Sequence, residues 1–174
     1  MVIIYDALDS ILEFMELGGG VLWWIMLVLF MMWSFIIERY WYFQVLHPRR
    51  MRSVVAAWDA RADTTSWYAK RIRDAMISEV AESLNRGLPV IKTLVAICPL
   101  LGLLGTVTGM IQVFDVMGLT GTGNARAMAG GVSKATVPTM AGMVAALSGV
   151  YFASRLEQTS RVETEKLEDL LQHH

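Results

Sequence analysis

The sequence predicts an all-α membrane protein with three transmembrane helices. Of its 174 residues, 55% are hydrophobic and only 18% are charged. Three runs contain no charged residue, and each is about as long as a helix must be to cross a bilayer: residues 17–37, 93–114 and 135–154. Buried helices of a soluble bundle rarely stay uncharged on every face over such lengths, so a soluble protein is the weaker interpretation.

The distribution of charge predicts how the three helices are oriented. Residues 1–16 contain four acidic residues and no lysine or arginine, whereas residues 38–91 contain nine lysines and arginines. Because positively charged segments stay in the cytoplasm, we expect residues 38–92 to form a cytoplasmic helical region. The N-terminus is then external, residues 115–134 form a short external linker, and residues 155–174 form a cytoplasmic tail.

The N-terminal segment and the first span have distinct apolar patterns. Within residues 1–16, apolar and acidic positions alternate at helical spacing, which is typical of an amphipathic helix at the outer interface; a frayed terminus is the alternative. Trp23 and Trp24 mark the outer end of the first span, as interfacial aromatic residues do. Ser34 is its only strongly polar residue, so we expect this helix to face lipid and to lie at the periphery of any pore.

The cytoplasmic region is predicted to contain two helices, over about residues 50–62 and 66–87. They follow a break at residues 47–50 (His-Pro-Arg-Arg), and the Asp-Thr-Thr-Ser sequence of residues 63–66 favours helix caps between them. Apolar residues at a spacing of four indicate a face that packs on neighbouring helices: Ile72, Met76, Val80 and Leu84. The basic residues fit a solvated face, with anionic lipid headgroups as the alternative partner.

The second and third spans contain small and hydroxyl-bearing residues that an ordinary lipid anchor lacks. Gly102, Gly105 and Gly109 leave one helix face without side chains, and such faces let helices approach closely. Pro99 and Pro138 have no N–H group, so each deprives the carbonyl four residues earlier of its helical partner. Freed carbonyls at membrane depth need water, a hydroxyl or a neighbouring helix, so the two prolines fit helices around a hydrated path.

Thr106, Thr136 and Thr139 are the candidate site residues. A threonine hydroxyl both donates and accepts hydrogen bonds, so it can line a hydrated pore or meet a partner's carboxylate. The alternative is that each hydroxyl bonds back to its own helix. The three spans contain no Asp or Glu, and the chain has no catalytic constellation, metal-ligand spacing or phosphate loop. We therefore expect no enzymatic activity and no cofactor, metal or nucleic acid partner.

Two motifs carry a resemblance to a known family. Residues 99–114 read Pro-Leu-Leu-Gly-Leu-Leu-Gly-Thr-Val-Thr-Gly-Met-Ile-x-x-Phe, and residues 131–142 read Gly-Val-Ser-Lys-Ala-Thr-Val-Pro-Thr-Met-Ala-Gly. Both closely resemble the proton-channel family of ExbB, TolQ and MotA, and the resemblance extends over residues 17–170. The three spans and the Ile-Glu-Arg-Tyr sequence of residues 37–40 resemble the ExbB/TolQ branch, and the short length resembles a compact ExbB.

The resemblance implies a homopentamer in the bacterial inner membrane, whose second and third helices line a central pore. Thr106 and Thr139 match the family's two pore threonines. A single-span ExbD-type partner would carry a protonatable Asp in that pore. The complex would use the proton motive force to energise TonB for the import of nutrients such as iron–siderophore complexes. A TolQ-like role in envelope integrity and a non-conducting membrane scaffold are the alternatives.

One position departs from the family's pattern. Relatives often have Glu five residues before the third-helix threonine, where this chain has Lys134. A lysine cannot relay protons as a carboxylate does, so the role of that Glu is not carried over. Thr106 and Thr139 share a depth in the membrane only if the third helix starts near Gly130. We therefore predict that Lys134 lies about one turn inside that helix.

Overall fold

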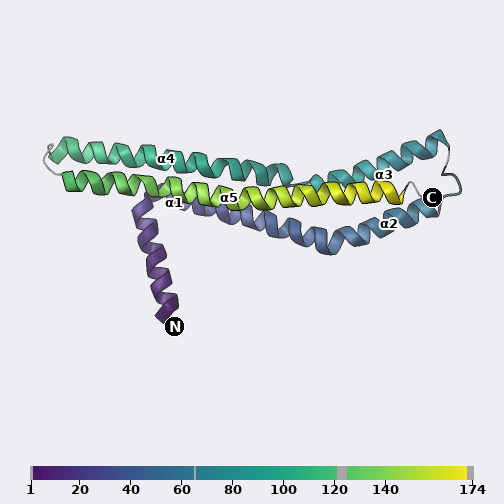
Figure 1. The fold of residues 1–174 in the computed structure, drawn as a ribbon, viewed down its shortest axis with the longest axis horizontal. Helices are drawn as coiled ribbons and strands as arrows, with labels where there is room; N and C mark the ends of the chain where they lie inside the picture. The colour runs from purple at the N-terminus through teal and green to yellow at the C-terminus, as the bar shows by residue number, and fades with distance from the viewer. Residues whose placement is uncertain (1, 65, 121–124, 172–174) are drawn as a thin grey trace. The chain divides into compact units, whose positions relative to one another are not determined.

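The computed structural model describes residues 2–64, 66–120 and 125–171, and helices account for nearly all of them. Five α-helices follow one another along these residues (Figure 1): α1 (Val2–Trp41), α2 (His47–Asp59), α3 (Trp67–Asn85), α4 (Leu88–Thr120) and α5 (Ala125–Leu170). A π-helical turn, η1 (Tyr42–Leu46), joins α1 to α2. Three helical segments are long and apolar enough to cross a membrane: Gly19–Asp59, Trp67–Gly118 and Met128–Leu170. The all-α prediction with three spanning helices is confirmed.

The chain divides into two compact units. Unit 1 comprises Met1–Met32 and Thr93–Gly149, and unit 2 comprises Trp33–Lys92 and Val150–His174. The candidate threonines all belong to unit 1. Unit 2 contains α2 and α3 together with the C-terminal part of α5.

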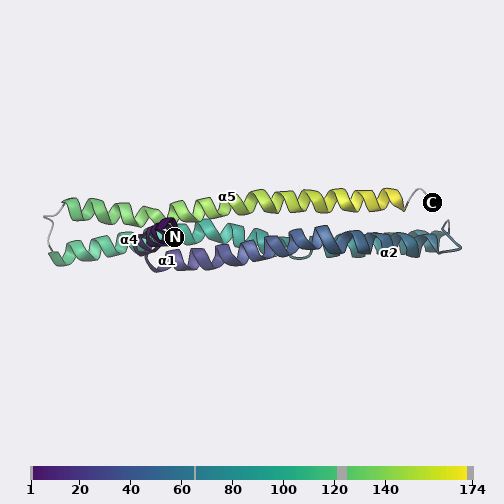
Figure 2. The ribbon, with the colours of Figure 1, turned by 90° about the horizontal axis from the view of Figure 1, so that it is seen from below.

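Unit 1 is built on α4 and α5, which lie side by side in both views (Figures 1 and 2). A Cβ atom added at Gly109 of α4 would lie 2.7 Å from Cβ of Ala135 on α5. A Cβ atom added at Gly102 would lie 3.0 Å from Cα of Thr139. The glycine face that the sequence predicted for close helix contact is therefore confirmed, and it is used within the chain.

The helix α1 changes direction at Gly19. This residue has φ 66° and ψ −166°, a backbone conformation that glycine adopts without strain from a Cβ atom. Leu22 and Ile25 lie in one buried cluster with Met15, against which Leu101 of α4 and Ala141 of α5 pack. Because Trp23 and Trp24 remain exposed, the part of α1 after Gly19 packs on the α4–α5 pair with one side only. That its other side faces lipid stays a prediction.

Unit 2 has its own apolar core between α2, α3 and α5. The core contains Trp58 of α2, Val80 and Leu84 of α3, and Leu167 of α5. Val80 and Leu84 belong to the apolar stripe that the sequence predicted, and Met76 of the same stripe packs against the core while half-buried. Three of the four stripe residues thus belong to this packing face, and the fourth, Ile72, is half-buried but is not part of this core.

The capping of α3 also follows the prediction. Ser66 is the N-cap residue, and its side chain accepts a hydrogen bond from the backbone N–H of Tyr68 at 3.1 Å. The Asp63 carboxylate accepts a hydrogen bond from the Ser66 N–H at 3.1 Å. These two bonds satisfy donors that a helix start leaves unpaired, so α3 begins where the sequence indicates.

Two predictions about connecting segments are wrong. The expected break at residues 47–50 is absent, because η1 runs into α2 and Pro48 occupies the first turn, where its missing N–H is not needed. The expected linker over residues 115–134 is helical up to Thr120 and again from Ala125, and of these residues only 121–124 lie outside the described structure.

Packing on α4 accounts for a glycine in the N-terminal part of α5, where a linker was expected. Gly131 lies against the Val113 side chain of α4, so its small size serves helix packing instead of a turn. Lys134 lies inside α5, as predicted, but the predicted start near Gly130 is wrong: the helix begins at Ala125, so Lys134 lies more than one turn inside it.

Candidate functional site

The candidate site lies on the α4–α5 pair of unit 1, where Thr139 contacts α4. The Thr139 hydroxyl donates a hydrogen bond to the carbonyl oxygen of Gly102 at 3.0 Å. Pro138, the preceding residue, is fully buried and packs into the space that Gly105 leaves free. Thr139 therefore links the two helices, an arrangement that neither of the two sequence-based alternatives describes.

Thr106 and Thr136 instead bond back to their own helices. The Thr106 hydroxyl donates to the carbonyl oxygen of Leu103 at 2.7 Å, and the Thr136 hydroxyl donates to that of Ser133 at 2.8 Å. In all three threonines the hydroxyl hydrogen is used within the chain, and the lone pairs of the oxygen remain able to accept. Their lining of a pore stays a prediction.

The glycines around these threonines, together with Pro138, form the packing face between α4 and α5. Pro99 lies inside α4 and Pro138 inside α5, and both helices continue through them. A Cβ atom added at Gly142 of α5 would lie 3.2 Å from Cα of Gly102 on α4. Close backbone approach at several successive turns leaves little freedom for the two helices to slide or rotate against each other.

The apolar length of the α4–α5 pair carries no charged side chain. Residues 93–114 and 135–154 contain no Asp, Glu, Lys or Arg. Lys134 precedes the second of these runs directly, and its side chain is exposed. Across the described part of the chain, no group of three His, Cys, Asp or Glu residues could hold a metal ion. The pair therefore offers hydroxyls and backbone groups, and no carboxyl group, along these two runs.

Unit 2 contains ion pairs beyond the predicted spans. Lys92 of α4 lies 2.9 Å from the Glu157 carboxylate of α5, and Arg161 lies 3.5 Å from the other oxygen of that carboxylate. The hydrogen bond from Lys92 is the main cause that holds the pKa of Glu157 below its ordinary value. Glu157 is thus held as a carboxylate beside the N-terminal part of α4.

A second polar contact joins α2 to α5. The buried His47 ring lies with Nε2 3.2 Å from Glu163 Oε2, and Lys166 Nζ lies 2.6 Å from Glu163 Oε1. Burial of Glu163 raises the pKa of its carboxyl group, but the hydrogen bonds from Lys166 and His47 outweigh it, so the net pKa lies below the ordinary value.

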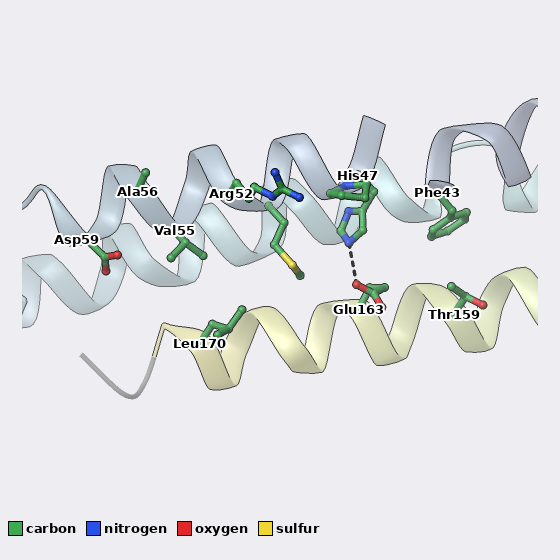
Figure 3. Close-up of a pocket in the computed structure, with 11 residues that line it drawn as sticks. Phe43, His47, Arg52, Val55, Ala56, Asp59, Thr159, Glu163 and Leu170 are labelled. Atoms are coloured by element: carbon green, nitrogen blue, oxygen red, sulfur yellow. Dashed lines mark hydrogen bonds and ion pairs between the residues drawn. The ribbon is translucent and has the colours of Figure 1, made fainter. Parts of the chain in front are cut away.

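The His47–Glu163 contact lies in the wall of a groove between α2 and α5 (Figure 3). We call it the α2–α5 groove; its volume is about 530 Å³. Most of its lining is apolar, and Asp59 and Leu170 lie at one end of it. The α2–α5 groove is therefore mostly apolar, with a few charged side chains in its wall.

The sequence patterns did not reveal these unit 2 contacts. His47 and Glu163 are 116 residues apart, and Ser160 donates a hydrogen bond to Asn85, 75 residues away, at 3.0 Å. One signal was present: Ser160 and Glu163 interrupt the apolar face that Leu156 and Leu167 define on α5. Polar residues on a packing face indicate buried hydrogen bonds, but not their partners.

Three long apolar helices, with small and hydroxyl-bearing residues between two of them, define a polytopic membrane protein. Residues 45–169 match the family model described as the MotA/TolQ/ExbB proton channel family. The chain belongs to this family. Its members are components of proton channel and transport complexes and do not form an enzyme family.

Within this family, similar proteins described as ExbB or ExbB-like place the chain in the ExbB type. A putative biopolymer transport protein ExbB-like 1 from Helicobacter pylori is 30% identical over 163 residues, which cover 83% of this chain and 86% of the relative. The protein of the same description from Synechocystis is 42% identical over 67 residues, 37% of this chain and 26% of the relative. Biopolymer transport protein exbB1 of Vibrio cholerae is 35% identical over 98 residues, 56% and 43% of the two chains. The match with the Synechocystis protein thus spans about a quarter of its length. These likenesses identify a bacterial membrane protein.

Proposed function

We propose that this chain is a stator and proton-channel subunit of the bacterial inner membrane. With an ExbD-type partner it uses the proton motive force to energise a TonB-type protein for outer-membrane import of nutrients of the iron–siderophore type. One observation carries the proposal: the α4–α5 pair is tightly packed and hydroxyl-bearing, yet has no acid along its apolar length. A proton path along this pair needs a carboxyl group from another chain.

The assembly follows from the same reasoning. Five copies surround a central pore, with residues 93–114 and 135–154 as its lining helices and residues 17–37 at the periphery. The excess of basic residues supports a cytoplasmic region over 38–92, with the N-terminus in the periplasm. Residues 115–134 are then periplasmic and residues 155–174 cytoplasmic.

Thr106 and Thr139 are the residues we assign to the pore, with Thr136 and Lys134 as secondary candidates. The side chains of both threonines are half-buried in the single chain, so part of each remains free to meet a partner. Gly102, Gly105, Gly109 and Pro138 lie where the two helices meet and thereby fix where these hydroxyls stand; Pro99 is a further candidate for this role.

Replacement of the pore threonines tests this proposal. In a host that lacks its own ExbB-type subunit, Thr106→Val and Thr139→Val are expected to preserve membrane insertion and partner co-purification while nutrient uptake is lost. The matched control is Thr108→Val: like Thr106 it lies on α4 and bonds back to its own helix, here to Leu104 at 3.0 Å, but it does not match the family's pore threonines. Control uptake should stay near normal. Normal uptake with both Thr106→Val and Thr139→Val would contradict the pore assignment.

Two further measurements separate the alternatives. A protonophore is expected to abolish the uptake that this chain restores, because moving one proton across 100 mV supplies about 2.3 kcal/mol. Uptake that persists in the protonophore would support a passive scaffold. Rescue of envelope integrity in a host without its TolQ-type subunit, with no rescue of uptake, would assign the TolQ-like role.

A further inference from the structure

The start of α3 exposes aromatic residues that a water-soluble surface rarely leaves uncovered. The exposed fractions of Trp67 and Tyr68 are 72% and 67%, although Trp is on average a highly buried residue. Arg71 lies over the Trp67 ring, 5.3 Å from its centroid, and Lys70 is also exposed. We call these four residues the aromatic tip. Trp, Tyr and Arg are the residue types that dominate the energetics of protein interfaces.

The α2–α5 groove has the complementary character within the same unit. Its volume of about 530 Å³ is that of a site for a ligand-sized group, and apolar atoms from Phe43, Met51 and Val55 line it. The carboxylates of Asp59 and Glu163 lie along it (Figure 3). Arg52 also lines the groove, and the Glu163 carboxylate already meets His47 and Lys166. An aromatic group therefore matches the apolar lining, and Asp59 at one end is the acid that a basic group beside it would meet.

The aromatic tip of one chain does not fill its own groove. None of its four residues lines the groove, and both aromatic side chains are exposed. The start of α3 and the end of α2 nevertheless lie at the same end of unit 2 (Figure 1). In a ring of copies whose axis runs along the helices, groups at the same level of neighbouring copies meet. A contact between two different patches is heterologous, and such contacts form a ring when the rotation between successive copies closes.

We propose that the aromatic tip of each copy inserts into the α2–α5 groove of the next copy, at the end where Asp59 and Leu170 lie. Trp67 packs against the apolar lining, and Arg71 and Lys70 approach Asp59. This inference rests on the proposed homo-oligomer and adds the contact that joins neighbouring copies outside the membrane.

Photo-crosslinking from position 67 tests the contact with an aromatic group kept in place. Membranes are prepared from cells that produce the full chain in two isotope-labelled forms, one of them with a photoreactive benzoylphenylalanine in place of Trp67. Mass spectrometry is expected to find adducts on residues 43–59 or 159–170 of the other-labelled copy. The matched control places the same group at Ser78, an exposed residue of α3 outside the aromatic tip, and should give no such adduct.

A second variant measures the energetic weight of the tip. Trp67→Ala is expected to weaken association of the detergent-solubilised copies by about tenfold or more, as for an interface residue with a large contribution. Native mass spectrometry before illumination separates the two proposals. A monomeric wild-type chain overturns the oligomer and this contact together. If the oligomer is intact but adducts form only within one copy, form at other segments, or do not form, the contact alone is overturned.

Discussion

The guanidinium group of Arg39 lies directly against the Cα atom of Gly87. A Cβ atom added at Gly87 would come within 2.8 Å of Arg39 Nε and 3.2 Å of Nη2. Arg39 is buried, its Nη1 donates to the Ser83 carbonyl at 3.4 Å, and its guanidinium lies 5.3 Å from the Tyr42 ring centroid. Gly87 stands between α3 and α4 with φ 89°. The end of α1 therefore fixes the joint from which α4 begins.

Gly87→Ala is expected to destabilise the protein by about 1–3 kcal/mol, because a Cβ atom at this positive φ strains the backbone and meets Arg39. The measurement is thermal unfolding in detergent. Gly118→Ala is the control, since a Cβ atom there meets nothing within 4 Å inside α4. That control should match the wild type or exceed it slightly. Equal stability of the two variants would contradict the role of Arg39 at the joint.

The combination Arg39→Ala with Gly87→Ala separates the two causes of strain. Removal of the guanidinium relieves the contact but leaves the positive φ, so the double variant should lose less stability than the sum of the two single variants. Interaction energies between contacting residues are about 0.5–3 kcal/mol. Strict additivity in the same unfolding measurement would show that the contact contributes nothing.

Gly105→Ala is expected to loosen the α4–α5 pair although Ala favours helices. Its Cβ atom would overlap the Pro138 ring, and such overpacking costs about 1–3 kcal/mol. The control is Gly130→Ala on α5, where a Cβ atom meets nothing within 4 Å. Thermal unfolding and susceptibility to protease should separate the two variants. A Gly105→Ala protein as stable as Gly130→Ala would mean that the pair is less tightly packed than its backbone distances indicate.

Glu163 predicts a dependence of stability on pH. Its pKa is lower in the folded protein than the ordinary value of about 4.3, so the charged carboxylate stabilises the fold fully above that value. This stabilisation is lost as the pH falls through the lowered pKa. The wild type should therefore unfold at a higher temperature than Glu163→Gln between pH 5 and 7.5, by a margin that shrinks below about pH 4.5.

Glu165→Gln is the matched control for this pH series, because Glu165 is an exposed residue of the same helix. It reports the general effect of removing one carboxylate from α5. A margin for Glu163→Gln that stays constant down to pH 3.5, or that equals the control at every pH, would exclude the contact with His47 and Lys166 as a source of stability.

The parts of the fold that depend on local sequence were predictable. Each spanning helix contains a long run without charge, and Ser66 caps α3 as its residue type and position indicate. The segment between α4 and α5 was not predictable in the same way. Gly131 lies in the segment that the sequence predicted to be a linker. Its small size serves packing against Val113 of α4, and the sequence alone does not show which helix lies opposite.

The candidate site was predictable in its composition and only partly in its contacts. The glycine face of α4 indicated a close helix neighbour, but not that the neighbour is α5 of the same chain. The hydrogen bond from Thr139 to Gly102 joins residues 37 positions apart, and no local spacing specifies it. Arg39 and His47 likewise depend on elements distant in sequence, so their surroundings emerge only when the helices are packed.

The hydrogen bond between Thr139 and Gly102 determines which protonation state of a carboxyl group the pore threonines can bind. Thr139 and Thr106 each donate their single hydroxyl hydrogen to a carbonyl oxygen, so each presents only lone pairs to whatever meets it. Lone pairs attract the O–H group of a neutral carboxylic acid and repel a carboxylate. If a partner's Asp reaches these threonines, the arrangement favours its protonated form. Release of the proton would then weaken the contact between that Asp and the threonine hydroxyls.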